Sequence, residues 1–275
     1  MSFYTSLSGL KGAQTEMSVV SNNIANAGSI GFKRSAAQFG DIFASSPSQS
    51  TRTIAGQGTR LNGITQQFTQ GSYETSEKTL DMAIVGEGFF VVKGAPPSNA
   101  VTYSRNGAFT PLEDGRVVDT IGSTLQLLPV DADGNVTDRT LGAAYDLVIP
   151  KMSPDNPDAA LVNVSVGTDG LVTATFADGS EQPLGKVAMA SFPATEGLRP
   201  IGDAHWQSTG ESGQPVIDSP GSGSMGAVRS GAIERSNVDI TEELVMLIAA
   251  QRNFQANAKA IEGASALTQT IINMR

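Results

Sequence analysis

Residues 2–27 read SFYTSLSGLKGAQTEMSVVSNNIANA, and this stretch decides how the fold begins. Its apolar residues recur at spacings of three or four, on one stripe of a helix, and are Phe3, Leu7, Leu10, Ala13, Met17, Val20, Ile24 and Ala27. Two internal glycines weaken that helix by about 1 kcal/mol each, and Gly28 and Gly31 supply a stop. We expect a helix from about Ser2 to Ala27 whose opposite face is rich in Ser, Thr, Gln and Asn.

The end of the chain mirrors its beginning. Asp239 is in the position of an N-cap, with Glu242 three residues later, and acidic residues in that first turn suit the helix dipole. Apolar residues then continue at helical spacing, namely Leu244, Leu247, Phe254, Ala258, Ile261, Ala264, Leu267, Ile271 and Met274. Narrow apolar stripes of this kind need partners for stability. The two end helices are expected to pair with each other, coiled-coil fashion, or with the same helices of other copies.

The region between the helices, residues 32–231, has the pattern of β structure. Turn dipeptides typical of hairpins occur at Asn62-Gly63, Asn106-Gly107, Asp114-Gly115, Asp133-Gly134, Asp169-Gly170 and Asp178-Gly179. Short apolar or alternating runs lie beside them, at residues 82–85, 89–92, 125–128, 162–166 and 171–176. The expected fold class is therefore α+β, with paired terminal helices around a central antiparallel β sandwich or barrel-like domain.

The same patterns divide the chain into expected domains. Residues 1–30 and 236–275 are predicted to form a terminal helical polymerisation domain, and residues 77–235 a β-rich outer domain. Residues 31–76 are predicted to be a linker or extended region, with an irregular stretch from Ser45 to Gly58.

Composition excludes several classes of function. The formal net charge is −9, whereas nucleic-acid binding favours basic patches that neutralise phosphates. The acidic balance also disfavours anionic membrane surfaces, and no apolar run approaches the roughly 20 residues that span a bilayer. The chain contains no cysteine, which rules out disulfides and thiolate chemistry. We expect no nucleic-acid partner and no membrane insertion.

No stretch predicts an active site. His205 is the only histidine and has no nucleophile-elbow pattern near it, so we interpret it as a packed or surface imidazole. Residues 131–135, DADGN, lack the spacing and terminal glutamate of an EF-hand loop, and a turn explains them better than calcium binding. The expected sets of catalytic, cofactor-binding and metal-binding residues are therefore empty.

Two motifs at the ends of the chain resemble the signature of the flagellar rod and hook family. The first ends the N-terminal helix and comprises Asn22, Asn23, Ala25, Asn26, Gly31, Phe32 and Lys33. The second leads into the C-terminal helix and comprises Ser236, Asn237, Val238, Glu242, Glu243, Gln251 and Arg252. Residues 80–84, 88–90 and 103–109 resemble the opening of the family's β domain. Residues 27–30, AGSI, depart slightly, because the family more often shows a threonine there.

The resemblance implies a structural subunit without enzymatic activity or a cofactor. In such proteins the terminal helices pair and line the inner tube of a helical polymer, around the channel through which later subunits travel. Residues 1–7 have no signal-peptide pattern, which alone predicts a cytosolic protein. The resemblance replaces that expectation with export by the flagellar type III apparatus, without a cleaved signal, to the bacterial flagellum. The expected partners are further copies of the chain and other flagellar axial proteins, those of the rod, the hook cap and the hook–filament junction.

Within the family, residues 63–71, 231–234 and 252–257 resemble hook proteins more than rod proteins. The length of 275 residues is closer to that of the distal rod protein. The hook is the assignment we favour, and the rod is the alternative. Subunit packing is expected to rest on the apolar side chains of Leu7, Leu10, Met17, Ile24, Leu244, Leu247, Phe254 and Ile261.

Two other classes of protein remain open from the sequence. A β-rich secreted hydrolase would require the central body alone to turn over a substrate, with His205 in a cleft. A monomeric adhesin would keep both end helices folded without self-association. A filament subunit is instead expected to have ends that order on assembly.

Overall fold

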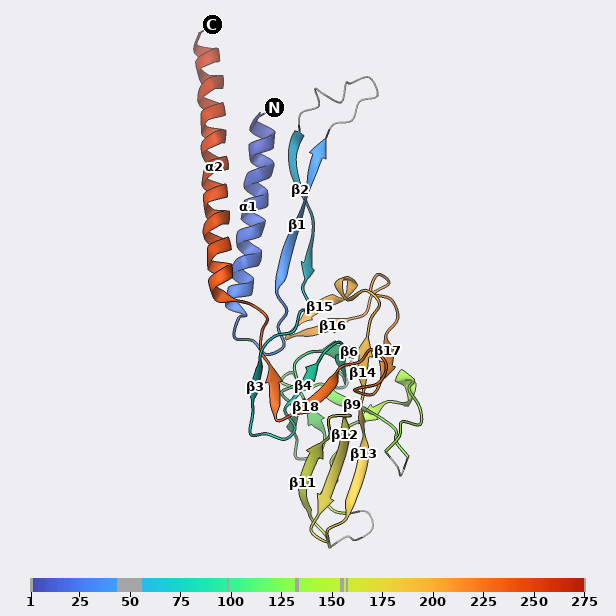
Figure 1. Cartoon of the computed structure of the whole chain (residues 1–275). Coiled ribbons are helices and arrows are strands. Elements are labelled where there is room, and N and C mark those ends of the chain that lie inside the picture. The colour runs from blue at the N-terminus through green and yellow to red at the C-terminus, as the bar shows by residue number, and fades with distance from the viewer. Residues whose placement is uncertain are drawn as a thin grey trace. The chain divides into compact units, whose positions relative to one another are not determined.

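The computed structural model describes residues 2–43, 56–97, 99–131, 134–153, 156 and 158–274 (Figure 1). Its contacts divide the chain into two compact units. Met1–Ala27, Arg34–Gln67 and Val238–Arg275 form the first, here called the helical unit. Gly28–Lys33 and Phe68–Asn237 form the second, the β unit. Most of the expected irregular stretch from Ser45 to Gly58 lies outside the described residues.

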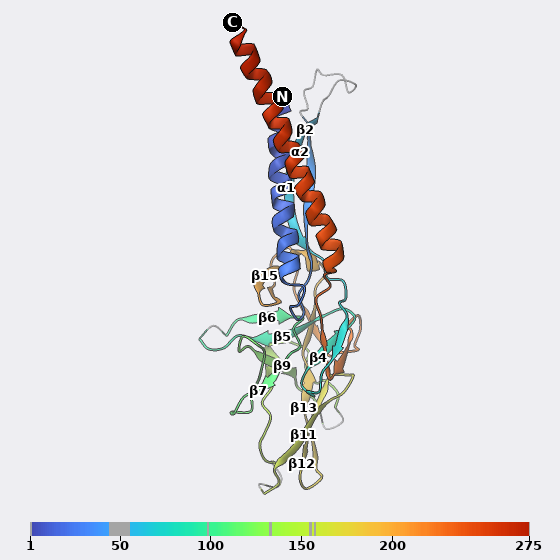
Figure 2. The same ribbon diagram turned by 90° about the vertical axis from the view of Figure 1, so that its left-hand side faces the viewer.

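The helical unit contains two long helices, α1 (Ser2–Ala25) and α2 (Ile240–Asn273). They lie side by side with the two chain ends at the same end of the pair, so they run antiparallel (Figures 1 and 2). The predicted N-cap is confirmed, because the Asp239 carboxylate accepts hydrogen bonds from the backbone N–H groups of Thr241 and Glu242.

One row of covered positions in α2 alternates at spacings of four and three, which is the pattern of a coiled-coil seam. The row comprises Glu243, Leu247, Ala250, Phe254, Asn257 and Ile261, and Met246, Ala258 and Ala264 beside it are also half-buried. The predicted pairing of the terminal helices is therefore confirmed. Gly9 of α1 lies against this seam, since a Cβ there would come within 2.7 Å of the Asn257 side chain. Close helix approach thus explains one glycine that weakens the helix.

The helical unit also contains a two-stranded antiparallel hairpin of β1 (Ser35–Phe43) and β2 (Gly56–Gln66) beside α1 (Figure 1). These strands fall in the segment expected to be a linker or extended region. The prediction of a hairpin turn at Asn62-Gly63 is wrong. Gln38 pairs with Gly63 and Phe39 with Leu61, so Asn62 is the extra residue of a β-bulge inside β2.

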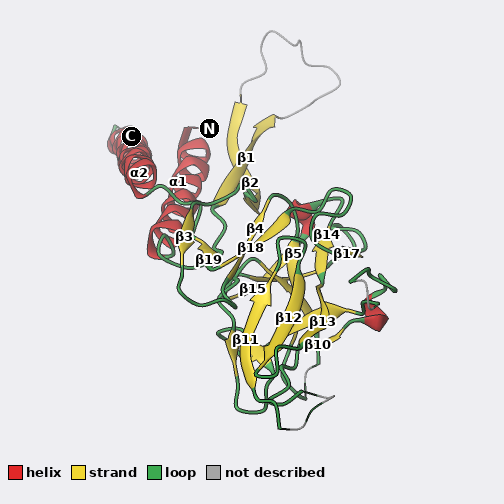
Figure 3. Cartoon of the chain, turned by 60° about the horizontal axis from the view of Figure 1, so that its bottom comes forward, coloured by secondary structure: helices red, strands yellow, loops and turns green. Residues whose placement is uncertain are grey.

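The β unit contains the remaining described strands, all paired antiparallel (Figure 3). They are β3 (Tyr73–Thr75), β4 (Met82–Val85), β5 (Phe89–Lys93), β6 (Val101–Ser104), β7 (Thr110–Pro111), β8 (Val117–Val118), β9 (Thr124–Leu128), β10 (Tyr145–Asp146), β11 (Leu161–Val166), β12 (Leu171–Phe176), β13 (Glu181–Val187), β14 (Met189–Ser191), β15 (Arg199–Gly202), β16 (His205–Gln207), β17 (Val216–Asp218), β18 (Ala227–Ser230) and β19 (Ala232–Glu234). Short 3₁₀ helices occupy Leu141–Ala143 and Thr195–Gly197. The main path of the sheet runs β11-β12-β13-β9-β5-β6-β16-β15.

Several turn predictions can be compared with these strands. Hairpin turns at Asp114-Gly115, Asp169-Gly170 and Asp178-Gly179 are confirmed by backbone hydrogen bonds that close each loop. The hairpin predicted at Asn106-Gly107 is wrong, because β6 pairs with β5 and β16 rather than with the next strand. The Asn106 side chain instead accepts a hydrogen bond from the Ala108 N–H. The prediction at Asp133-Gly134 includes a residue outside the described part of the chain.

The core of the β unit lies on both faces of its central strands. Phe90 and Val92 of β5 pack into one apolar cluster, and Phe89 and Val91 into another. The second cluster is aromatic and centres on Trp206, whose ring meets Phe89 edge-on at 5.6 Å between centroids. The alternation of side chains along one strand thus fills two layers. The predicted α+β fold with a sandwich-like antiparallel body is confirmed.

Candidate assembly site

The predicted packing residues of the terminal helices differ in how far they are buried. The side chains of Leu7, Leu10, Met17, Ile24, Leu247, Phe254 and Ile261 are half-buried, whereas Leu244 is exposed. The pairing of α1 with α2 therefore covers only part of the predicted stripe. Contact of these side chains with neighbouring copies stays a prediction.

A second apolar face of α2 is uncovered within the chain. It begins at the start of the helix with Ile240, Leu244, Val245 and Ile248, all between 45% and 63% exposed. A shallow hollow of about 330 Å³ lies beside it, lined by Val245, Ile248, Ala249, Arg252 and Asn253. At the other end, α2 continues past the start of α1 (Figure 1) and exposes Leu267, Ile271, Ile272 and Met274. Groups of exposed apolar side chains of this kind mark interaction sites.

A largely buried polar cluster in the helical unit joins the end of α1, the start of α2, the start of β1 and the residue that follows β2. Glu243 and Asn23 are 1% exposed, and the Asn23 amide donates to the Glu243 carboxylate at 3.1 Å. Arg34 donates to the same carboxylate at 2.5 Å and to the Gln67 side chain at 2.9 Å. The amide of Asn23 also exchanges two hydrogen bonds with the backbone of Ser35. We call these residues the helical junction.

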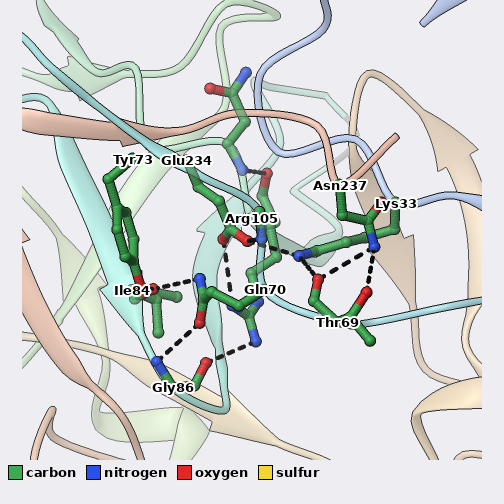
Figure 4. Close-up of polar contacts among 12 residues, drawn as sticks. Lys33, Thr69, Gln70, Tyr73, Ile84, Gly86, Arg105, Glu234 and Asn237 are labelled. Carbon is green, nitrogen blue, oxygen red and sulfur yellow. Dashed lines mark hydrogen bonds and ion pairs between the residues drawn. The ribbon is translucent and has the colours of Figure 1, made fainter. Parts of the chain in front are cut away.

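A second polar cluster is buried in the β unit and is built around one carboxylate (Figure 4). The Lys33 ammonium lies 2.7 Å from one Glu234 oxygen, and both side chains are fully buried. The Arg105 guanidinium lies 3.3 Å from the other Glu234 oxygen and donates to the Gly86 carbonyl at 3.1 Å. The Arg105 guanidinium also stands 5.3 Å from the centre of the Phe89 ring. Two buried cations therefore share one buried anion.

Backbone and neutral side chains complete this cluster, which we call the β junction. Lys33 also donates to the Thr69 carbonyl at 2.8 Å, and the Asn237 amide donates to the same carbonyl at 3.2 Å and to the Thr69 hydroxyl at 2.8 Å (Figure 4). The Gly71 N–H donates to the Glu234 carboxylate at 2.9 Å. The Gly31 N–H donates to the Glu234 carbonyl at 2.9 Å.

Gly31 is the motif residue with the tightest backbone constraint. Its φ is +68°, and a Cβ would come within 2.7 Å of the Arg105 carbonyl carbon and the Asn106 nitrogen. A side chain there would meet rigid backbone in a conformation that L residues rarely adopt.

Replacing Gly31 with alanine is expected to lower the free energy of unfolding of the β unit by about 1–3 kcal/mol. Gly28→Ala is the matched control, because among the described residues beyond its chain neighbours no atom lies within 4 Å of a Cβ at that position. Urea denaturation followed by the fluorescence of Trp206, the single tryptophan, measures both variants. Equal stability of the two would contradict the steric argument.

The buried charges of the β junction perturb one another. Burial lowers the pKa of the Lys33 ammonium from 10.5; the Glu234 carboxylate opposes that shift and Arg105 adds to it. Burial also lowers the pKa of Arg105 and raises that of Tyr73, whose hydroxyl lies in the same cluster. The desolvation of Lys33 outweighs its attraction to Glu234.

A pH dependence of stability follows from the Lys33 shift. The unfolded chain holds the Lys33 proton more tightly than the folded protein does, so the free energy of unfolding should rise with pH in the window below 10.5. Lys33→Met should remove this rise. Urea denaturation across this window measures the difference, and parallel pH profiles would contradict the prediction.

The remaining motif residues lie outside the two junctions or at their edges. Asn22, Ala25, Glu242, Gln251 and Arg252 are exposed, and Phe32 and Val238 are half-buried. The Asn26 amide caps the Asn22 carbonyl at 3.0 Å, and Ser236 is buried. Sequence reasoning missed the roles of Arg34, Arg105 and Glu234. The sequence did offer one indication for Glu234. A charged residue that directly follows the apolar pair Ala232-Ile233 is a candidate for a buried charge.

His205 is a packed residue, the first of the two alternatives that the sequence left open. Its Nε2 lies 2.7 Å from the Asp119 carboxylate, its Nδ1 lies 2.8 Å from the Asp203 carbonyl, and both His205 and Asp119 side chains are fully buried. Both ring nitrogens are thus engaged by structural partners. Within the described residues, no group of three or more His, Asp or Glu side chains is placed to hold a metal ion. None of the described helices is long and apolar enough to cross a membrane.

Three family models match successive parts of the chain. The flagella basal body rod protein model matches residues 3–33, the flagellar hook protein FlgE/F/G D1 domain residues 83–174, and the flagellar basal body rod FlgEFG protein C-terminal model residues 229–274. The flagellar basal-body rod protein FlgG of Bacillus subtilis is 30% identical over 285 residues, covering 100% of this chain and 98% of its own. The chain belongs to the flagellar rod and hook family.

Relatives in this family include both hook and rod proteins. The FlgG protein of Buchnera aphidicola subsp. Baizongia pistaciae is 34% identical over 96% of this chain and 95% of its own. The flagellar hook protein FlgE of Salmonella typhimurium is 27% identical over 412 aligned positions, covering 100% of both chains. A solved Helicobacter pylori flagellar hook protein FlgE2 overlaps 72% of this chain and 42% of its own, but its TM-score of 0.24 at 13% identity is too slight to carry an argument. The chain is a structural subunit of the flagellar axis.

Proposed function

We propose that this family member is the subunit of the flagellar hook, a self-assembling helical tube that transmits motor torque to the filament as a universal joint and conducts exported subunits. The uncovered apolar surface of the paired terminal helices carries this proposal. Exposed patches occur at both ends of α2, and contacts between unlike patches of successive copies generate an open helical polymer.

Two observations bear on the choice between hook and rod, and each favours a different assignment. Residues 63–71, 231–234 and 252–257 resemble hook proteins, and we rank the hook first on that ground. The rod is the second candidate because the alignment with the Bacillus subtilis rod protein spans 285 positions, against 412 for the Salmonella hook protein. The hook relative thus contains residues without a counterpart here.

Each part of the chain has a proposed role in the tube. Residues 1–30 and 236–275 polymerise as the inner tube, residues 31–76 brace neighbouring copies, and residues 77–235 form the outer layer. In a hook the outer contacts slide while the inner helices stay paired; in a rod the same joints are locked. The subunit has no catalytic role, leaves the cell through the flagellar type III apparatus, and adjoins other axial proteins.

Immunogold electron microscopy of isolated hook–basal bodies tests the assignment. Antibody raised against the β unit is expected to label the curved hook along its length. Label confined to the rod after removal of the outer rings would make the rod the correct candidate. Absence of label from both structures would overturn the proposed function.

A further inference from the structure

The chain enters or leaves the β unit through three segments, and the β junction contains all of them. Gly28–Lys33 lies between Ala27 and Arg34 of the helical unit, Phe68 follows Gln67, and Asn237 precedes Val238. Each segment therefore has a covalent continuation in the helical unit. Any force that reaches the β unit from the terminal helices through the chain must arrive along these segments.

Hydrogen bonds tie the three segments to one another. Lys33 of the first segment contacts both Thr69 of the second and Glu234 of the third. Glu234 in turn accepts from the Gly71 N–H, and Asn237 donates to Thr69. Each pair of segments is thus joined directly, by charge-assisted bonds for the pairs that include Lys33 or Glu234.

The same cluster is anchored in the β core. Arg105, at the end of β6, joins Glu234 to the Gly86 carbonyl and packs over the Phe89 ring. Gln70 adds a second anchor through the Ile84 carbonyl at 2.9 Å and the Gly86 N–H at 3.0 Å (Figure 4). The cluster therefore connects the entering segments to strands β4, β5 and β6.

Stability alone does not explain this arrangement. Desolvation makes buried ion pairs costly, and apolar replacements of similar volume are often as stable or more so. Here two cations share one carboxylate, and Arg105 Nε has no hydrogen-bond partner among the described residues. A directional network does fix geometry more strictly than apolar packing does.

We infer that the β junction is a load-sharing clamp, which joins the three connecting segments so that torque entering along one is distributed over all three and into the β core. Lys33, Glu234, Asn237 and Thr69 are its positioning residues. The helical junction around Glu243 fastens the chain on the other side of the Lys33–Arg34 peptide bond. The mechanical part of this inference rests on the proposed function.

Variants that weaken the clamp without stranding a charge provide the test. Lys33→Met removes the ties to Thr69 and Glu234 but leaves Glu234 paired with Arg105. Asn237→Ala removes the two exposed hydrogen bonds to Thr69 and serves as a second variant if Lys33→Met fails to fold. Lys186→Met is the matched control, because Lys186 makes an ion pair of 2.9 Å with Asp169 in the same unit, away from the connecting segments.

Hydrogen exchange of the purified full-length protein tests the clamp itself, independently of its place in the flagellum. Lys33→Met and Asn237→Ala are expected to lose amide protection at Gly31 and Gly71 while amides of β5 and β9 keep theirs. Uniform loss across the β unit would show a general stabiliser, and unchanged protection at both glycines would show no clamp. Either result would overturn the inference.

Swimming under load tests the mechanical role. In bacteria deleted for the natural gene, both clamp variants are expected to build normal numbers of flagella and to swim normally in dilute medium. At raised viscosity they should lose speed, whereas Lys186→Met should follow the natural protein. Clamp variants that follow Lys186→Met at every viscosity would overturn the mechanical role. Normal motility of the deletion strain would instead overturn the proposed function and leave the exchange result standing.

Discussion

Replacing Glu234 with glutamine is expected to lower the free energy of unfolding of the β unit by about 3–5 kcal/mol, since removing one partner leaves buried charge uncompensated. Glu234 is the shared anion of Lys33 and Arg105, and all three side chains are between 0% and 4% exposed. The substitution preserves shape but leaves two buried cations without a carboxylate. The Gly71 N–H would retain an amide oxygen as acceptor.

Urea denaturation followed by Trp206 fluorescence measures this effect, because Trp206 lies in the buried aromatic cluster of the β unit. Glu74→Gln is the control: Glu74 pairs with Arg235 at 3.0 Å, but both side chains are about half exposed. Such exposed pairs contribute about 0–1 kcal/mol. A Glu234→Gln protein as stable as Glu74→Gln would contradict the importance assigned to the buried carboxylate.

Replacing Leu247 with aspartate is expected to abolish assembly while the β unit stays folded. Leu247 is half-buried on the seam of α2, between the covered positions Glu243 and Ala250. A carboxylate there would be partly desolvated in an apolar seam, which costs more than the loss of the leucine's apolar contacts alone. The paired helices would separate, and with them the apolar surface proposed for contact between copies.

Electron microscopy of flagella and a swimming assay read out Leu247→Asp, and Trp206 fluorescence of the purified protein checks that the β unit is folded. Leu247→Met is the control, since it conserves volume and polarity. Motile cells with normal hooks in the aspartate strain would refute the role of the helix seam.

Apolar runs and periodicity predicted much of the fold. Strands β4 and β12 begin and end at the predicted residues. The apolar stripe predicted for α2 is covered only in part, because Leu247 and Phe254 are half-buried whereas Leu244 is exposed. The β1–β2 hairpin was missed because its strands bury little and carry mixed polar residues, so their alternation is weak. The dipeptide Asn62-Gly63 misled for a related reason: the residues that favour tight turns also favour bulges.

The junctions were predicted only in part. The motifs included Asn23, Lys33 and Glu243, which are buried in them, yet gave no sign of which residues they would contact. Lys33 and Glu234 are 201 positions apart in the chain, and such pairing has no local period. The exposed motif residues Ala25, Gln251 and Arg252 are the ones we propose for contacts between copies.

Electron microscopy of hook–basal bodies from a strain deleted for this gene tests the central claim most directly. A hook subunit predicts complete rods and rings that lack the curved hook. Structures that end within the rod would show that the chain is a rod subunit and not a hook subunit. Intact basal bodies with normal hooks would contradict the assignment of this chain to the flagellar axis.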